Sequence, residues 1–193
     1  FHNSSEGVSA SGAIFEQIEK RSSRVVTPLP KSDAGLTVIV GPSGIGKSTW
    51  LRSAVTESTS WQPQSPMLTS GTVLENIIGP EPLDEQALER SIELSGLDDV
   101  ALDYSLGSDD QGVSGGQAQR ISLARAIYRL LSKNKQILLL DEPTSAQNEQ
   151  RQAEIIENLK KLTAEGVQVF VISHQRSAID SADVLIDFQE QYA

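Results

Sequence analysis

The sequence predicts an α/β fold with a mostly parallel sheet, and three observations support this prediction. Short apolar runs rich in β-branched residues alternate with longer segments whose apolar residues recur at helical spacing. The short runs are apolar at consecutive positions, which is typical of strands buried on both faces. One run leads directly into a glycine-rich loop and then a helix, an order found in parallel α/β sheets. At 193 residues, the chain is long enough for one domain with a buried core.

The N-terminal part is expected to be a linker followed by the first strands. Residues 1–12 are rich in serine, glycine and asparagine, a composition typical of flexible segments. Short apolar stretches around Ile14 and Phe15 and at residues 24–26 are expected to form edge strands. The first buried strand is expected at residues 36–40, which read Leu-Thr-Val-Ile-Val.

Helices and strands alternate along the rest of the chain. Asp84 is a suitable N-cap and Gly96 a suitable stop for one of these helices, and Gly166 follows the end of another. Helices are expected at residues 48–55, 84–94, 114–131 and 149–164, and strands at residues 136–140, 167–172 and 184–186.

Residues 41–48 form a complete phosphate loop, G-x-x-x-x-G-K-S. In such a loop backbone N–H groups surround phosphate oxygens, the lysine (Lys47) reaches the β- and γ-phosphates, and the serine hydroxyl (Ser48) can bind Mg²⁺. The motif predicts binding of a nucleoside triphosphate but does not indicate which class of nucleotide-binding protein this is. The expected nucleotide contacts here are Gly41, Ser43, Gly44, Ile45, Gly46, Lys47, Ser48 and Thr49.

A second acidic feature follows the apolar strand at residues 136–140, where Asp141 and Glu142 are adjacent. Ligands of open α/β sheets bind beyond the carboxyl ends of the strands, so Asp141 is expected beside the phosphate loop. There it can hold Mg²⁺ together with Ser48. Glu142 is then placed to act as a general base toward water. A solvated acidic rim is the alternative, and the intact phosphate loop argues against it.

Residues 113–117, Val-Ser-Gly-Gly-Gln, resemble the signature motif of the ABC ATPases, and the resemblance continues through residue 126. The spelling S-x-x-Q also satisfies a capping box, so a well-capped helix is the simpler reading. A helix start with two glycines nevertheless exposes N–H groups and a positive dipole end to a phosphate. The resemblance implies that Ser114, Gly115, Gly116 and Gln117 contact the γ-phosphate of ATP bound by another subunit.

Two further positions match the ABC family. Gln64, within Trp-Gln-Pro-Gln-Ser-Pro, looks like the glutamine that senses Mg²⁺ and the attacking water and links to a transmembrane partner. His174 matches the switch histidine that contacts the γ-phosphate, and it closes an expected strand. The resemblance therefore implies catalytic roles for Glu142, His174, Lys47 and Gln64, and metal binding by Ser48, Gln64 and Asp141.

The resemblance covers residues 36–187 and implies a P-loop NTPase (RecA-like) architecture. After the linker, residues 13–193 are expected to form one ABC ATPase domain. Its RecA-like core would comprise residues of about 24–67 and 135–193, and a helical subdomain residues of about 68–134. Lys47 and Gln64 lie 64 − 47 = 17 positions apart, fewer than is usual in the family, so the antiparallel β-subdomain is expected to be reduced.

Two departures from the family concern nucleotide contacts and subunit communication. No aromatic residue can be assigned to stack on adenine, although Phe15 is near the expected place; aromatic–base stacking is worth roughly 1–3 kcal/mol. Asn148 stands at the end of the loop at residues 145–148, where the family usually has aspartate, which weakens the expectation of communication between two sites.

Composition restricts the partners. The net charge of −10 disfavours a nucleic acid, whose phosphates require a basic face. Because there are no cysteines, disulfides and zinc–thiolate sites are excluded. No apolar run approaches the length of a bilayer-spanning helix, so a membrane role is expected to come through a partner or a segment outside this sequence.

The resemblance then implies an ATP-hydrolysing nucleotide-binding domain of an ABC exporter, with ATP and Mg²⁺ as ligands, at the cytoplasmic face of a membrane. Its expected partners are a second nucleotide-binding domain and transmembrane domains. Segment 70–77 is similar to exporter-type domains in particular. Two alternatives remain: a regulatory subunit with weak turnover, which the shortened β-subdomain would suit, and an ABC ATPase without a transport role.

Overall fold

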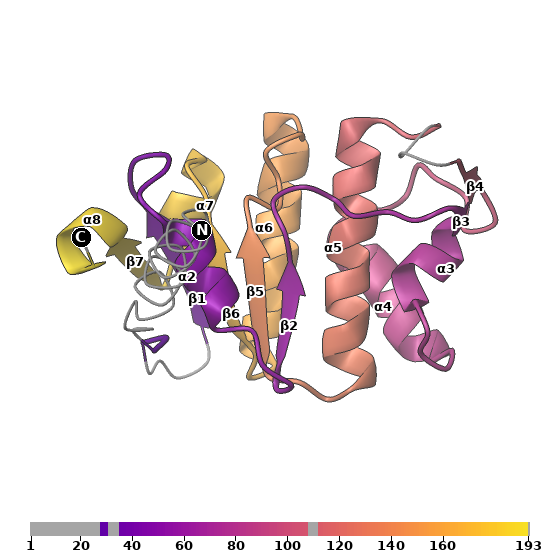
Figure 1. Cartoon of the computed structure of the whole chain (residues 1–193), viewed down its shortest axis with the longest axis horizontal. Coiled ribbons are helices and arrows are strands. Elements are labelled where there is room, and N and C mark those ends of the chain that lie inside the picture. Colours follow the sequence, from indigo (N-terminus) through magenta and orange to yellow (C-terminus); the bar gives the residue numbers. More distant parts are fainter. Residues whose placement is uncertain (1–27, 31–34, 108–111, 193) are drawn as a thin grey trace, which may run out of the picture.

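The computed structural model describes residues 28–30, 35–107 and 112–192. Within these residues the central sheet has five strands in the order β2-β5-β6-β1-β7, and all of its pairs are parallel. The strands are β1 (Gly35–Val40), β2 (Thr59–Gln62), β5 (Ile137–Asp141), β6 (Gln168–Ile172) and β7 (Val184–Asp187). Their carboxyl ends meet at one edge, the upper one in Figure 1.

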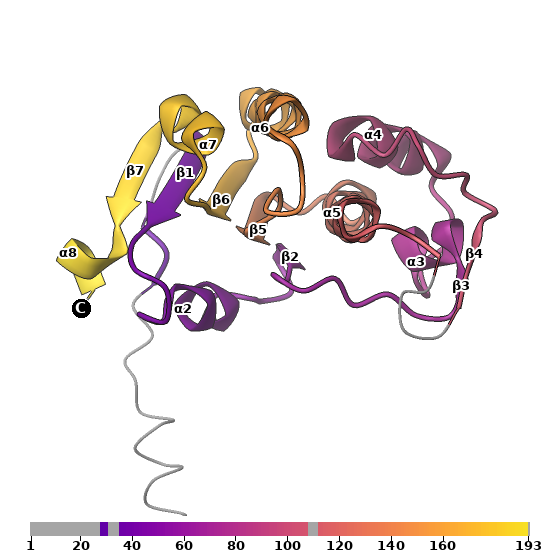
Figure 2. The same cartoon turned by 90° about the horizontal axis from the view of Figure 1, so that it is seen from above.

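Helices lie on both faces of the sheet and beyond one end of it. Helices α6 and α7 cover one face and α2 lies on the other, whereas α3, α4 and α5 gather beyond the edge strand β2 (Figure 2). The helices are α2 (Lys47–Ser53), α3 (Val73–Ile78), α4 (Glu85–Ser95), α5 (Gly115–Ser132), α6 (Glu149–Ala164), α7 (Arg176–Ser181) and α8 (Phe188–Tyr192).

The core strands contribute alternate side chains to two apolar clusters. In β5, Leu138 and Leu140 belong to the cluster beneath α6, and Leu139 belongs to the cluster beneath α2. In β6, Val169 follows the first pattern and Phe170 the second. Because successive strand side chains point to opposite faces, a strand covered on both sides needs consecutive apolar residues.

A third cluster holds α3, α4 and α5 together. Tyr128 of α5 is fully buried there; its hydroxyl donates to the Pro82 carbonyl at 2.7 Å and accepts from the Asp84 N–H at 3.0 Å. A small antiparallel sheet at this end of the molecule pairs β3 (Gly71–Thr72) with β4 (Ser105–Leu106). It lies among the residues expected to form the helical subdomain, not between Lys47 and Gln64, where the reduced β-subdomain was expected. The short interval between the phosphate loop and Gln64 contains α2 and the parallel strand β2.

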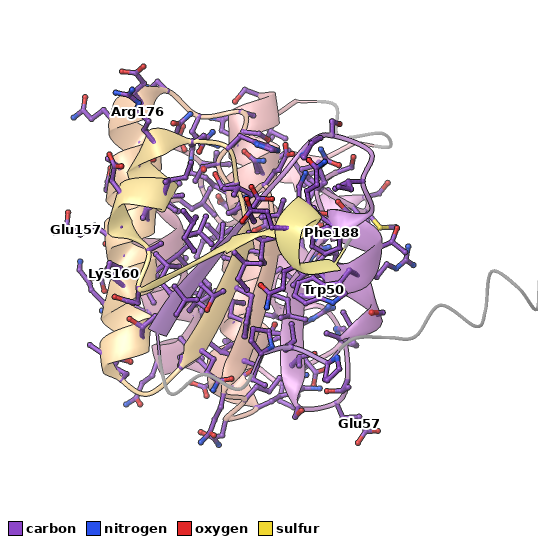
Figure 3. The ribbon with its side chains drawn as sticks, turned by 90° about the vertical axis from the view of Figure 1, so that its left-hand side faces the viewer. Trp50, Glu57, Glu157, Lys160, Arg176 and Phe188 are labelled. Carbon is purple, nitrogen blue, oxygen red and sulfur yellow. The ribbon has the colours of Figure 1, made fainter. Side chains whose placement is uncertain are left out.

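The C-terminal helix α8 packs against the base of the phosphate loop. The rings of Phe188 and Trp50 meet edge to face, with centroids 5.6 Å apart (Figure 3). Gly41, at φ 140°, passes beneath this contact, and a Cβ there would lie 3.4 Å from the Phe188 Cβ. The loop therefore leaves β1 under α8, at a point where glycine supplies both the backbone angle and the space.

The expected helices and strands from residue 36 onward are confirmed, with shifts of one or two residues at their ends. Asp84 and Gly96 cap α4 as predicted. Strand β2 and the short helices α3, α7 and α8 were not predicted. The linker at residues 1–12, the edge strands expected near residues 14–15 and 24–26, and Phe15 lie outside the described residues.

Candidate nucleotide-binding and catalytic site

The phosphate loop connects β1 to α2 and is open on the side where a phosphate would lie. Gly44 and Gly46 adopt φ angles of 79° and 107°, which L side chains rarely adopt, and no atom lies within 4 Å of an added Cβ at either position. Gly46 is also the N-cap of α2. The loop backbone is thereby left uncovered beside the start of a helix, an arrangement suited to binding an anion.

Lys47 lies across its own loop. Its side chain is buried, at 6% exposure, and its Nζ donates to the carbonyls of Gly41 at 2.6 Å and Pro42 at 2.9 Å. The ammonium group is thus already held beside the adjoining pocket, which has a volume of about 260 Å³. The pocket is lined by Ser43, Gly44, Gly46, Lys47, Ser48, Thr49, Gln64, Glu142 and Ile172.

Asp141 is placed at the end of β5 with one carboxylate oxygen unpaired. The residue is 3% exposed, and the Ser48 hydroxyl hydrogen-bonds to its carboxylate. Its Oδ1 is buried and has no hydrogen-bonding partner among the described residues. Burial, together with the charge of Glu142, raises the pKa of Asp141, while Ser48 and Lys47 oppose that rise. A buried oxygen ligand without a partner, next to a serine hydroxyl, fits a divalent cation such as Mg²⁺.

Glu142 follows with its backbone in the left-handed region, at φ 49°. Its N–H donates to the Ile172 carbonyl at 3.0 Å, so β6 fixes one side of its peptide backbone. The residue lines the phosphate-loop pocket and also a neighbouring cavity of about 160 Å³ that His174 lines. Glu142 therefore borders one space together with Lys47 and another together with the exposed His174.

Gln64 also lies between two spaces. It is exposed and lines both the phosphate-loop pocket and a larger groove of about 710 Å³ beside it. Ser48 and Thr49 likewise border both. The groove is lined further by Arg52, Val55, Trp61, Pro63, Ser65, Met67, Ser122, Arg125, Arg129 and Asp141.

The start of α5 is well formed but does not reach the phosphate loop of the same chain. Ser114 and Gln117 form a reciprocal capping box, with hydrogen bonds of 3.2 and 2.9 Å. Gly115 has open space where a Cβ would stand. None of residues 114–117 lines the phosphate-loop pocket. Figure 1 shows the start of α5 at the same edge of the molecule as the phosphate loop, displaced from it along the long axis.

Comparisons with known proteins agree with this arrangement. A family model described as ABC transporter matches residues 52–145. ATP-binding cassette sub-family B member 10, a mitochondrial protein of Mus musculus, is 34% identical over 187 residues, covering 77% of this chain and 25% of that protein. The ATP-dependent permease MDL1 of Candida albicans is 33% identical over 186 residues, covering 79% of this chain and 27% of that protein. The chain belongs to the ABC transporter ATPase family.

A solved structure shows the same fold for this ABC ATPase. The structure of a bacterial Atm1-family ABC exporter with ATP bound superimposes with a TM-score of 0.68 at 22% sequence identity. The match covers 80% of this chain and 32% of that one. The chain thus spans about a quarter of the length of the two relatives and about a third of the solved exporter chain.

The loop after Glu142 departs from the family in sequence, and the structure gives Asn148 a local role. Its Oδ1 accepts a hydrogen bond from the Arg151 N–H at 2.9 Å, so Asn148 is the N-cap of α6. Capping requires a side-chain oxygen and no charge, which asparagine supplies as well as aspartate does. The sequence analysis did not identify Gln119 as a residue of the site. The Gln119 side chain hydrogen-bonds to this same loop, whose residues lie more than twenty positions away in the sequence.

Proposed function

We propose that the chain binds Mg²⁺-ATP and hydrolyses it as the nucleotide-binding domain of an ABC exporter. One observation carries this proposal: the buried, unpaired Oδ1 of Asp141 lies in a carboxylate bonded to Ser48, close to a pocket that Lys47 and Glu142 both line. The groups proposed to bind phosphate, to bind the metal and to act as the base would thus lie in or beside one pocket. A purely structural role would not require an unpaired buried carboxylate oxygen, which costs free energy.

Each side chain takes one part of the reaction. The open backbone of residues 41–49 and the Nζ of Lys47 hold the phosphates, while Ser48, Asp141 and Gln64 would hold Mg²⁺. When bound, Mg²⁺ neutralises charge on the phosphate oxygens. Glu142 accepts the proton of the attacking water as a general base. His174, across Glu142, contacts the γ-phosphate.

A second ABC nucleotide-binding domain completes the site. Ser114 and Gly115 at the start of α5 are exposed, yet they lie away from the phosphate loop of their own chain (Figure 1). Residues 114–117 of one domain would therefore bind the γ-phosphate held by the phosphate loop of the other. Two ATP molecules then lie between two domains, either two copies of this chain or this chain and a related one.

Transmembrane domains are the second expected partner. The groove beside Gln64 is lined by Arg52 and Arg129 and by Met67, which is 70% exposed. A surface that combines cationic and apolar side chains suits a docked segment of a partner. In the part of the chain that the structure describes, no helix has both the length and the apolarity needed to cross a bilayer. The proposed location is the cytoplasmic face of a membrane.

The proposed domain division fits this docking. The helical subdomain, residues of about 68–134, would carry α3, α4 and α5, while the RecA-like core would hold the phosphate loop and Asp141. The groove would lie where these two parts meet, because Arg125 and Arg129 of the helical subdomain line it together with Ser48 of the core. Docking there would link the partner to Gln64 at the nucleotide pocket.

The proposal is tested by the rate of ATP hydrolysis of the Glu142→Gln variant. Loss of a general base should lower turnover by a factor of about 10² to 10⁴, while ATP binding measured by calorimetry is retained. Glu157→Gln is the matched control, because Glu157 lies exposed on α6 (Figure 3). Turnover of Glu142→Gln equal to that of Glu157→Gln would remove Glu142 from the role of base.

A further inference from the structure

We propose that Gln119 is a positioning residue for Glu142, through which the start of α5 sets the backbone at the catalytic carboxylate. The inference rests on the proposed function, because it assigns Glu142 the role of general base. It concerns a buried amide on the signature helix that neither the phosphate nor the metal would touch.

The Gln119 side chain is 2% exposed and uses both ends of its amide on one loop. Its Nε2 donates to the Glu142 carbonyl at 2.7 Å and to the Ser145 hydroxyl at 2.9 Å. Its Oε1 accepts from the Ala146 N–H at 3.0 Å. A single side chain from α5 thus binds three residues of the loop that follows β5, and it does so out of contact with water.

Glu142 needs such support because its backbone is strained. A non-glycine residue in the left-handed region costs about 1–2 kcal/mol, and its surroundings must compensate for that cost. The N–H of Glu142 donates to the Ile172 carbonyl of β6. The Glu142 carbonyl accepts from Gln119 of α5 at 2.7 Å and, at 3.3 Å, from the N–H and the hydroxyl of Ser145 in its own loop. Gln119 thus supplies the shortest of these bonds and the one that comes from another element, and with Ile172 it holds the peptide groups on either side of the Glu142 Cα.

A second set of contacts joins the same loop to the first turn of α5. Gln147 donates from Nε2 to the Gly116 carbonyl at 2.8 Å. A Cβ on Gly116 would lie 3.0 Å from the Ala146 carbonyl oxygen, so glycine is what allows this approach. In the proposed dimer this first turn faces the ATP of the partner. Gln119 therefore connects a helix that responds to one ATP with the base that acts on the other.

The decisive variant is Gln119→Met, which keeps the size of the side chain and removes its hydrogen bonds. Gln62→Met is the matched control: Gln62 is also fully buried, and its Nε2 donates to the backbone carbonyl of Gln119, at 3.5 Å, rather than to the loop after β5. We expect kcat for ATP hydrolysis to fall at least tenfold in Gln119→Met with KM changed less than twofold. Gln62→Met should leave both within twofold of wild type.

Hydrogen exchange and a second variant separate positioning from a loss of fold. In Gln119→Met, exchange should accelerate at the amides of residues 142–146 without nucleotide, and the rest of the sheet should stay protected. Gln119→Glu keeps an acceptor for the Ala146 N–H and, as a carboxylate, cannot donate to the Glu142 carbonyl. Its kcat should fall as in Gln119→Met while the Ala146 amide stays protected.

The possible outcomes distinguish this inference from the proposed function. If wild type hydrolyses ATP and both Gln119 variants match Gln62→Met in kcat, the positioning role is wrong and the proposed function stands. A parallel fall in kcat and in the cooperativity of urea unfolding in both Gln119 variants would also overturn it, because loss of fold would then explain the result. If wild type itself shows no turnover at saturating Mg²⁺-ATP, the proposed function fails and the inference fails with it.

Discussion

Replacement of Lys47 by alanine tests whether the loop at residues 41–48 binds the phosphates of ATP. The Nζ of Lys47 already lies against the carbonyls of Gly41 and Pro42, at 2.6 and 2.9 Å. Its side chain is buried against the rest of the chain. Little rotational freedom is therefore left to lose on binding, and this freedom would otherwise cost up to about 2 kcal/mol for a lysine.

The magnitude of the effect follows from the lost contacts. Hydrogen bonds to charged groups contribute about 1.5–3 kcal/mol each, and those to phosphate are among the stronger ones. Allowing for water that enters the open pocket in place of the ammonium, we expect a loss of about 2–4 kcal/mol in the free energy of ATP binding. At 1.4 kcal/mol per tenfold change, this loss is a decrease of roughly 30- to 1,000-fold in affinity.

The assay is calorimetric titration with ATP in the presence of Mg²⁺. Lys135→Ala is the control, because Lys135 donates from Nζ to a backbone carbonyl, that of Thr59, at 2.7 Å, and lies at the other end of the sheet. Both variants should lose some stability toward urea, and only Lys47→Ala should lose affinity. An affinity of Lys47→Ala within threefold of wild type would refute the assignment of the phosphate loop.

Three further predictions concern stability, each measured by urea unfolding. The pKa of Asp183 is lowered from 3.8, chiefly because its carboxylate accepts a hydrogen bond from the Leu36 N–H. The ionised Asp183 carboxylate should therefore stabilise the folded chain by about 1 kcal/mol, the value expected for a half-exposed group. This stabilisation is present above the unfolded pKa and is lost as the pH falls through the lower folded pKa. Asp183→Asn should remove this pH dependence of the free energy of unfolding, and an unchanged pH profile in the variant would contradict the prediction. Phe188→Ala should cost about 3 kcal/mol, because it removes the buried ring packed on Trp50; a cost below 1 kcal/mol would count against the packing of α8. Asn148→Ala should lower the free energy of unfolding by about 1 kcal/mol, and Asn148→Asp should hardly change it. Equal losses in the two variants would show that the N-cap hydrogen bond of α6 does not cause the effect.

The buried parallel strands could be predicted from the sequence because their environment leaves a simple pattern. Strands β1, β5 and β6 are covered by helices on both faces, so nearly every position is apolar. Strand β2 escaped prediction because it lies at the edge of the sheet and reads Thr-Ser-Trp-Gln. Its polar side chains are buried by pairing with α5, as in the hydrogen bond from the Ser60 hydroxyl to the Ala126 carbonyl at 2.6 Å.

The short helices were missed for a different reason. Six residues are too few to show a helical period, and tertiary contacts determine whether such a segment is helical. In α3 a local signal was nevertheless present: Thr72 and Glu75 have capping-box spacing, and the structure contains that box. The shape of α8 depends on Phe188 meeting Trp50, a contact between residues far apart in the sequence.

For the site, sequence reasoning identified side chains whose chemistry is local to a motif. Asp141 ends β5, Glu142 follows it, and Lys47 comes after the loop that leaves β1, so these residues lie at the carboxyl edge of the sheet. Two features of the site could not be predicted: the unpaired Oδ1 of Asp141, and the hydrogen bonds from Gln119 to the loop after β5. Each depends on packing between elements that are far apart in the chain.

The mass in solution of the Glu142→Gln variant tests the central claim most directly. In the proposed arrangement, ATP is held between the phosphate loop of one domain and residues 114–117 of another, and blocked hydrolysis should preserve that pair. Light scattering should give the mass of one chain without nucleotide and of two chains with Mg²⁺-ATP. The mass of one chain at a Mg²⁺-ATP concentration shown by calorimetry to saturate the site would contradict the account.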